Sequence, residues 1–162
     1  MDAEEPLTIG QAGADFGRWG ELLSFIRDAF SYMDGVIEPP SSIHRLDAYS
    51  LAEKSARETA IVVLSGRTIV GCAFLDDRDD RFYLGKLAVS PELQGRGIGR
   101  LLMAYCEGLA REAGKTAIEL QTRVELTGNQ QAFARLDFVE TERTAHAGYD
   151  RPTSITMRKA LA

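Results

Sequence analysis

In the middle of the chain, hydrophobic and polar positions follow the pattern of β-strands. Two β-branched segments, TAIVVL (59–64) and TIVGCAFL (68–75), are separated by the short turn SGR. After the charged turn DDRDD, the segment RFYLGKLAVS (81–90) is again largely apolar. Pro91 cannot donate a hydrogen bond to a sheet, so it helps to end this third strand. The pattern predicts three consecutive antiparallel strands.

Ahead of these strands, apolar residues recur every three or four positions, which is the spacing of a helix. The recurrence predicts a helix that begins after a cap at Asp15 and runs to Phe30. Residues 44–57 have the pattern of a second, more polar helix, within which Ser50 and Glu53 form a capping box.

After the third strand, helix and strand alternate. Helical spacing predicts a helix over residues 100–113 that ends at Gly114, and AIELQT (117–122) has the pattern of another strand. Strand, helix and strand in this order make a crossover unit. The strand ending at Val89 and the strand at 117–121 are therefore expected to run roughly parallel.

The remaining segments complete the fold. Residues 128–138 are expected to form a short helix and residues 154–161 a closing strand, with at most a strand and a loop between them. We find no internal repeat, low-complexity segment or linker, and a chain of 162 residues suits one core. The prediction is a single α+β domain over residues 1–162 with a mixed sheet.

Composition restricts the class of protein. A net charge of −5 at pH 7 argues against a surface that coats nucleic acid. The longest apolar stretch is interrupted by SGRT, so we expect no membrane-spanning segment. The acidic N-terminus lacks the basic and apolar regions of a signal peptide, which makes the cytoplasm the expected location.

Cysteine and histidine are too sparse for a metal site. Cys72 and Cys106 lie in apolar contexts at neither metal nor redox spacing, so they are expected to be buried, reduced thiols. His44 and His146 are far apart in the sequence and have no cluster of ligands around them, so we expect no zinc.

The segment QGRGIGR, between the third strand and the following helix, contains three alternating glycines. A helix N-terminus presents free backbone N–H groups and the positive end of the helix dipole. Glycines let a phosphate approach that backbone closely, and Arg96 and Arg100 add positive charge. The segment therefore predicts a ligand with phosphate groups, most simply a pyrophosphate.

Three other interpretations of this segment fit less well. A P-loop ends in Gly-Lys-Ser/Thr, whereas Gly99 is followed by Arg100 and Leu101. A dinucleotide-binding loop follows Gly-x-Gly-x-x-Gly and opens its fold, but here Arg100 replaces the last glycine and antiparallel strands come first. Glu119 does lie near the position of its ribose-binding acid. A simple turn would need only one glycine.

The segment LAVSPELQGRGIGRLLM (87–103) resembles the acyl-coenzyme-A-binding segment of the GNAT N-acetyltransferase superfamily. The signature of this family is Gln/Arg-x-x-Gly-x-Gly/Ala, and Gln94, Gly97 and Gly99 occupy its positions. The resemblance implies a central mixed sheet of about six to seven strands with about four flanking helices. This sheet would be splayed open beside the strand that ends at Val89.

The resemblance also implies the cosubstrate, which is acetyl-CoA or coenzyme A, without a metal. The pantetheine arm would lie along the third strand, and the pyrophosphate would rest on the glycine segment and the helix that follows. The residues implied in cofactor binding are Leu87, Ala88, Val89, Gln94, Gly95, Arg96, Gly97, Ile98, Gly99, Arg100, Asn129 and Phe133.

The implied reaction is direct transfer of an acetyl group from the thioester to an amine in a ternary complex. The amine must be neutral to attack, and a backbone N–H near Val89 would stabilise the oxyanion. No covalent intermediate on the enzyme is needed, so Cys106 is expected in the core rather than as a nucleophile. The acceptor is a small-molecule or peptide amine that the sequence does not identify.

The chain departs from the family at the residue that usually protonates the leaving thiolate. Phe133 stands where a tyrosine is common, Asp137 replaces a glycine, and Asn129 lies closer to this position than the usual asparagine. His146 or Tyr149 is a candidate for moving protons, although both also fit an ordinary surface hairpin.

Several further points stay open on the sequence. Tyr83 and Lys86 face either the acceptor or the solvent, and Glu38, His44 and Arg45 either shape the acceptor pocket or form a solvated surface. Dimerisation through a sheet edge or the final strands has no pattern to support it. The alternative functions are a non-catalytic acyl-CoA-binding sensor or interaction domain, and another type of nucleotide-binding protein.

Overall fold

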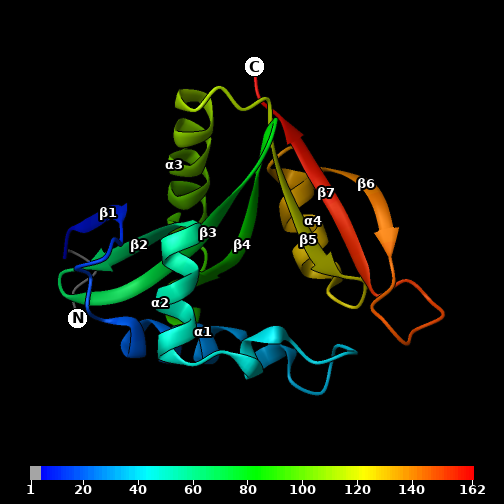
Figure 1. The fold of residues 1–162 in the computed structure, drawn as a ribbon, viewed down its shortest axis with the longest axis horizontal. Helices are drawn as coiled ribbons and strands as arrows, with labels where there is room; N and C mark the ends of the chain where they lie inside the picture. Colours follow the sequence, from blue (N-terminus) through cyan, green and yellow to red (C-terminus); the bar gives the residue numbers. More distant parts are fainter. Residues whose placement is uncertain (1–4) are drawn as a thin grey trace.

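The computed structural model describes residues 5–162. Within them, a mixed sheet of seven strands runs in the order β1-β2-β3-β4-β5-β7-β6. Figure 1 shows this sheet crossing the molecule from β1 to β6. The strands are β1 (Leu7–Gln11), β2 (Thr59–Ser65), β3 (Thr68–Arg78), β4 (Arg81–Val89), β5 (Ala117–Arg123), β6 (Val139–Thr144) and β7 (Ser154–Ala160).

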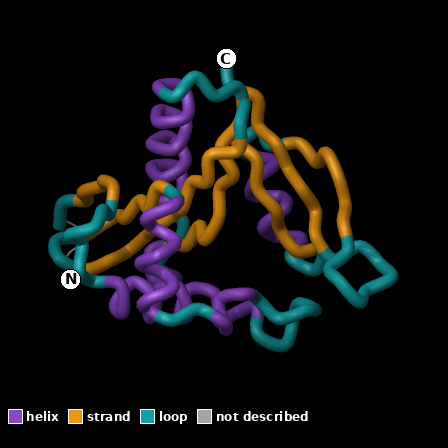
Figure 2. Tube along the Cα trace, in the orientation of Figure 1, coloured by secondary structure: helices purple, strands orange, loops and turns teal. Residues whose placement is uncertain are grey.

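Four α-helices in the described part of the chain flank this sheet (Figure 2). Helices α1 and α2 pack on each other and cover one face, whereas α3 contacts β2, β3, β4 and β5 from the other face. The predicted α+β fold with a mixed sheet is confirmed. The helices are α1 (Trp19–Phe30), α2 (Ala48–Arg57), α3 (Ile98–Glu112) and α4 (Thr127–Arg135), with the short 3₁₀ turns η1 (Ser31–Met33), η2 (Ser42–Arg45) and η3 (Pro91–Leu93).

Strand β2 shows why the central strands are almost continuously apolar. Ile61 and Val63 pack in the core on the α3 face, and Ala60 and Val62 pack in the core on the face of α1 and α2. Because helices cover both faces, a central strand has no solvent side that would alternate with the buried one. The antiparallel order of β2, β3 and β4 agrees with the predicted three strands.

The predicted crossover is confirmed, but it is short. Strands β4 and β5 pair in parallel at three positions only, from Arg81 opposite Ala117 to Tyr83 opposite Glu119. Figure 1 shows the two strands meeting at one end and diverging toward the other. The sheet is therefore open beside the C-terminal half of β4.

A β-bulge in β4 lies at the start of this opening. Lys86 and Leu87 together oppose the single residue Ala73 of β3. Lys86 adopts a left-handed backbone conformation with φ of 50°. A bulge bends the strand that carries it and increases its twist, so β4 turns away from β5 beyond the bulge.

The predicted starts of the first two helices are wrong. Helix α1 begins after Arg18 rather than after Asp15, and Arg18 makes no side-chain capping bond. Its guanidinium instead pairs with Glu21, at 2.6 Å, and donates to the carbonyl oxygen of Arg67. The first turn is thus held by contacts of Arg18 rather than by a preceding cap.

The expected helix over residues 44–57 is interrupted before Asp47, which caps α2. The Asp47 carboxylate accepts a hydrogen bond from the Ser50 backbone N–H, and the Ser50 hydroxyl accepts one from the Asp47 N–H. The capping box is therefore Asp47 with Ser50, and the predicted pair of Ser50 with Glu53 is wrong. The backbone at Asp47 is extended, which separates η2 from α2.

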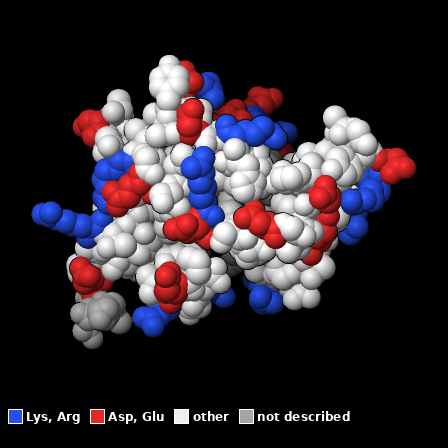
Figure 3. All heavy atoms as spheres, turned by 90° about the horizontal axis from the view of Figure 1, so that it is seen from below, with Lys and Arg blue, Asp and Glu red and all other residues white. Residues whose placement is uncertain are grey.

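Two further surface properties concern possible partners. In residues 5–162, no helix has the length and apolar character needed to cross a membrane. Acidic and basic side chains are interspersed over the face drawn in Figure 3, which therefore has no extended basic surface.

Candidate active site

The glycine loop (residues 94–100) runs from the end of η3 into the first turn of α3. Gly95 has φ of 84° and Gly97 has φ of 87°, and Gly97 is the N-cap of α3. Side chains other than glycine are strained at such positive φ values. Two of the three glycines are therefore required by the path of the backbone.

Packing against β3 holds this loop in place. Ile98, the first residue of α3, is buried in the core on the α3 face. A Cβ at Gly71 of β3 would lie 3.0 Å from Ile98 Cγ2 and 3.2 Å from Leu102 Cδ1. Gly71 pairs with Val89 at the end of β4. The absence of a side chain at Gly71 thus lets α3 begin close to the end of β4.

The backbone of the loop is open to a ligand. A Cβ at Gly95, Gly97 or Gly99 would meet no other atom within 4 Å. Gly99 has no positive φ, so neither packing nor backbone conformation explains its missing side chain. The first N–H groups of a helix have no partner within that helix. These features fit the close approach of a phosphate, and the exposed Arg96 and Arg100 supply positive charge.

A cleft of about 410 Å³ lies where β4 and β5 separate. It is lined by β4 and β5, by the segment between α1 and α2, by α4 and by the loop after β6. Thr122 of β5 lines this cleft, and its hydroxyl oxygen is buried without a hydrogen-bond partner in the described residues.

The bulge in β4 directs Lys86 into this cleft. Lys86 Nζ donates a hydrogen bond to Ser42 Oγ at 2.8 Å. Burial, followed by repulsion from the charge of Lys54, lowers the pKa of Lys86 to about 8. A cation is thus held in a partly desolvated position beside the opening of the sheet.

Residues 19–138 match the acetyltransferase (GNAT) family, and this match covers the loop, the opening of the sheet and most of the cleft. The chain belongs to the GNAT acetyltransferase family. It is 30% identical over 142 residues to an IAA acetyltransferase of Azospirillum brasilense, which covers 86% of this chain and 90% of the relative.

Solved structures of GNAT-type proteins share the fold. The PaiA N-acetyltransferase of Thermoplasma acidophilum, in complex with coenzyme A, has a TM-score of 0.79 at 15% identity, covering 96% of this chain and 99% of the other. The putative acetyltransferase YncA of Salmonella typhimurium, with acetyl-CoA, has a TM-score of 0.72 at 19% identity, covering 96% and 94%. The overall fold of this chain is thus shared with known acetyltransferases.

The structure separates the predicted cofactor residues into two groups. Leu87, Asn129 and Phe133 line the cleft, whereas residues 94–100 are not part of its lining. Ala88 is buried in the core, and Val89 ends β4 beside Gly71. The glycine loop and the cleft are therefore distinct regions that the end of β4 connects.

Phe133 is held at the cleft by α4. Its ring packs against Phe138 with ring centroids 5.9 Å apart. Asn129, one turn earlier, donates a hydrogen bond to the Tyr32 hydroxyl at 3.0 Å. Tyr32 of η1 therefore brings a phenol hydroxyl to the cleft whose wall contains Phe133.

The two candidate proton carriers of the loop after β6 differ in position. His146 lines the cleft and hydrogen-bonds to Thr153 Oγ1. Burial lowers the His146 pKa from its ordinary 6.5, and the Arg123 charge lowers it further. Tyr149 lies outside the lining of the cleft and donates a hydrogen bond to Glu38 Oε1 at 3.1 Å.

Both cysteines are free and fully buried, as expected. Burial raises the pKa of the Cys106 thiol to about 12, and it does the same for Cys72. A thiol with such a pKa holds its proton at neutral pH and is a poor nucleophile.

The sequence did not single out three residues that shape the site: Tyr32, Gly71 and Arg123. The Arg123 guanidinium donates to the backbone oxygens of Pro39 and Pro40, which ties β5 to the segment before η2. A glycine inside an apolar strand indicates that another part of the protein packs closely against the backbone there, so Gly71 could have been recognised from the sequence. Tyr32 and Arg123 had none, because their partners are far away in the sequence.

Proposed function

We propose that this chain is an acetyl-CoA-dependent N-acetyltransferase that transfers the acetyl group directly to an amine within a ternary complex. We further propose that residues 1–162 act as one domain in the cytoplasm. The observation that carries the proposal is the opening between β4 and β5 beside an uncovered glycine loop. Membership of the acetyltransferase family also supports the proposed acetyl transfer.

In this proposal the glycine loop holds the pyrophosphate of coenzyme A. Backbone N–H groups of residues 94–99 would donate to the phosphate oxygens, and Arg96 and Arg100 would add charge. The backbone of Leu87, Ala88 and Val89 would bind the pantetheine arm. Bound acetyl-CoA supplies a thioester as the acetyl donor.

The residues of the cleft would handle the charge and the protons of the reaction. A backbone N–H near Val89 would donate to the oxyanion that forms when the amine attacks. We assign proton removal from the amine to His146, because it lines the cleft and its lowered pKa leaves it neutral at pH 7. We give Tyr149 no direct role, because it lies outside the cleft lining.

Loss of the usual tyrosine is compatible with turnover. A thiol with a pKa of about 8.5 leaves as a thiolate without strong assistance. A general acid contributes typically about 100-fold or more to the rate, so Phe133 would slow the reaction rather than abolish it. Two tyrosines, Tyr32 and Tyr83, line the cleft in the described residues and are the phenols available there.

The first test is calorimetric titration of the protein with acetyl-CoA, coenzyme A, ATP and NADH. We expect micromolar binding of acetyl-CoA and coenzyme A, with no comparable binding of ATP or NADH. Tighter binding of either nucleotide would contradict the proposal. Absence of any binding would leave the glycine loop as a structural turn.

A second function, a non-catalytic acyl-CoA sensor or interaction domain, is favoured by one observation, the replacement of the family's tyrosine by Phe133. The two functions differ in the release of free thiol. Thiol release that depends on both acetyl-CoA and an added amine would dispose of the sensor. Binding of acetyl-CoA without thiol release across a broad panel of amines would favour it.

A further inference from the structure

Every charged residue that lines the cleft carries a positive charge. These residues come from four elements: Arg45 from η2, Lys54 from α2, Lys86 from β4 and Arg123 from β5. Within the described residues, no aspartate or glutamate belongs to the lining. In a protein whose net charge is −5, such a concentration of positive charge calls for a physical explanation.

Two of the four charges are compensated within the protein. Lys54 forms an ion pair with Glu58 at 2.8 Å, and Arg123 donates to backbone carbonyl oxygens. The other two have no carboxylate partner in residues 5–162. Lys86 donates only to the Ser42 hydroxyl, and the Arg45 guanidinium makes no hydrogen bond or ion pair there.

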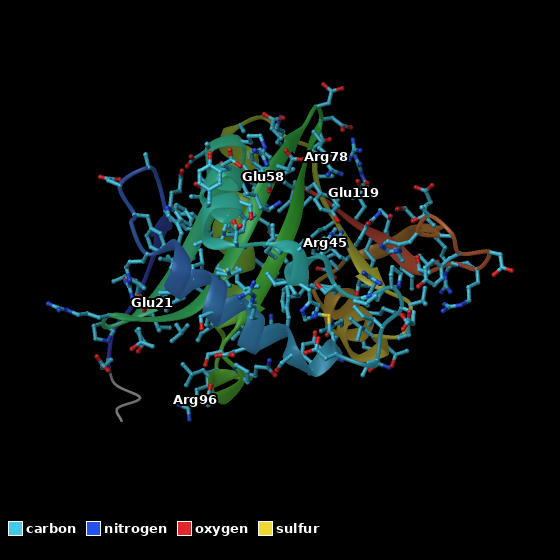
Figure 4. All side chains as sticks on the ribbon, turned by 60° about the horizontal axis from the view of Figure 1, so that its bottom comes forward. Glu21, Arg45, Glu58, Arg78, Arg96 and Glu119 are labelled. Carbon is cyan, nitrogen blue, oxygen red and sulfur yellow. The ribbon has the colours of Figure 1, made fainter. Side chains whose placement is uncertain are left out.

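Arg45 lies at the opening of the sheet and apart from the glycine loop. Figure 4 shows Arg45 near the region where β4 and β5 separate, and Arg96 at the bottom of the view, beside the loop. Arg96 and Arg100 do not belong to the lining of the cleft. The positive charge of the cleft is therefore separate from the charge beside the proposed pyrophosphate site.

Lys86 is the cation whose charged form this arrangement destabilises. Burial lowers its pKa, the charges of Lys54 and Arg45 lower it further, and Glu58 offsets only part of the effect. A bound anion beside Lys86 and Arg45 would relieve this repulsion. The same charges would repel an ammonium group and favour the neutral amine that can attack a thioester.

Apolar and uncharged polar side chains form the rest of the wall. Phe30, Met33 and Ile37 line the cleft on the side of the segment between α1 and α2, and Leu87 and Phe133 line it elsewhere. Uncharged polar side chains of η2, β5 and α4 line it as well. A cavity of about 410 Å³ admits a small molecule beside a thioester arm. The cleft thus combines two cations that have no carboxylate partner with apolar patches in its wall.

We propose that the acceptor is a small amino acid-like amine, which carries a carboxylate for Lys86 and Arg45 and an apolar side chain for the wall. This inference rests on the proposed N-acetyltransferase function and specifies its substrate class. The amine nitrogen forms a bond to the acetyl carbon, the carbon–sulfur bond breaks, and the amine proton leaves through His146. The products are an N-acetylated acid and free coenzyme A.

The first experiment compares acceptors that differ only in the carboxylate. Thiol release from acetyl-CoA is measured with L-phenylalanine, L-phenylalaninamide and 2-phenylethylamine, and with L-leucine and isopentylamine. We expect kcat/KM at least tenfold higher for each amino acid than for its counterparts. L-phenylalaninamide separates two effects. Its amine loses a proton more easily than that of L-phenylalanine, which favours attack, but it lacks the carboxylate that Lys86 and Arg45 would bind.

Variants assign the effect to the two cations. Lys86→Met and Arg45→Gln should each remove most of the preference for the carboxylate and leave the rate with 2-phenylethylamine much less affected. Arg57→Gln makes the same change of charge at an exposed position of α2 and should retain the preference. Equal or higher kcat/KM for 2-phenylethylamine in the unmodified protein would overturn the proposal.

A binding measurement decides the question even if none of these amines is acetylated. Calorimetry in the presence of coenzyme A compares N-acetyl-L-phenylalanine with N-acetyl-2-phenylethylamine. We expect at least tenfold tighter binding of the acid. Equal affinity, tighter binding of the uncharged compound, or binding of neither would contradict the proposal. A protein that binds no coenzyme A would instead refute the proposed function itself.

The pH dependence of this binding tests the role of Lys86. N-acetyl-L-phenylalanine keeps its charge at neutral and alkaline pH, whereas Lys86 loses its proton above about pH 8. The lowered pKa of His146 leaves that ring neutral over this range. Affinity should therefore fall from pH 7 to pH 9.5, and Lys86→Met should flatten the profile. An unchanged profile in the variant would remove Lys86 from the site.

Discussion

The glycine loop and the proposed acceptor side of the cleft are built in opposite ways. The loop is one continuous segment, and its glycines leave the backbone N–H groups uncovered by side chains. The proposed acceptor side consists of charged, polar and apolar side chains from separate segments of the chain. A backbone site of this kind suits a ligand shared by a whole family, whereas a site of converging side chains can change with each substrate.

The largest expected effect tests the backbone site. Gly99 is the second residue of α3, has ordinary φ and has free space around its Cβ position. Gly99→Glu should weaken coenzyme A binding more than 100-fold, because the carboxylate would repel the pyrophosphate. A negative charge at a helix N-terminus stabilises that helix, so the melting temperature should not fall.

The matched control for this prediction is Ala104→Glu. It adds the same charge to an exposed position of α3, away from the loop, and should bind coenzyme A normally. Calorimetry and thermal unfolding of both variants provide the comparison. Normal coenzyme A binding by Gly99→Glu would separate the glycine loop from the cofactor.

The next effect tests the side-chain site. If His146 removes the proton from the amine, His146→Gln should lower kcat by about 100-fold. The His146 pKa lies below its ordinary 6.5, so the rate of the unmodified enzyme should fall as pH drops through that lowered value. The variant should lack this acidic limb. A variant with full turnover and the same pH profile would make His146 a structural residue.

The third prediction concerns the packing that joins the two regions. Gly71→Val would force a side chain against Ile98 and Leu102, where even a Cβ lies 3.0 Å from Ile98 Cγ2. Overpacking of this kind should lower the free energy of unfolding by about 2 kcal/mol. It should also weaken coenzyme A binding, because α3 would shift from the end of β4.

Urea denaturation and calorimetry on the same sample measure both consequences. Gly128→Val is the control, because that glycine is exposed and a Cβ there would meet no atom within 4 Å. Unchanged unfolding of Gly71→Val would show that β3 and α3 have room between them.

The smallest effect is on stability and follows from Lys86. Its folded pKa of about 8 lies below the ordinary 10.5, so the unfolded chain binds more protons between these values. The contribution of Lys86 to stability therefore improves as pH rises from 8 toward 10. Lys86→Met should be more stable than the unmodified protein by about 1–2 kcal/mol at pH 7, allowing for partial exposure.

This advantage of Lys86→Met should shrink steadily between pH 8 and pH 10. Urea denaturation of both proteins across that range measures the difference directly. A constant difference would mean that Lys86 titrates in its ordinary range and is well solvated.

The sequence by itself determined the parts of this protein that depend on neighbouring residues. Strand β2 can be recognised because it is buried on both faces and is therefore apolar throughout. The glycine loop can be recognised because its backbone conformation requires glycines at nearby positions of the sequence. The crossover from β4 to β5 also follows from the order of local elements. Helix starts were harder to predict. The sequence also fits a capping box of Ser50 with Glu53, whereas the structure uses Asp47 with Ser50.

Only the tertiary structure decided the width of the opening and the composition of the acceptor side. The bulge at Lys86 depends on how β4 pairs with β3, and the sequence there shows an ordinary strand. Arg45, Lys86 and Arg123 meet because η2, β4 and β5 converge on one cleft. The charge of each residue is local, but the repulsion of Lys86 by Lys54 and Arg45 depends on distances that folding alone creates.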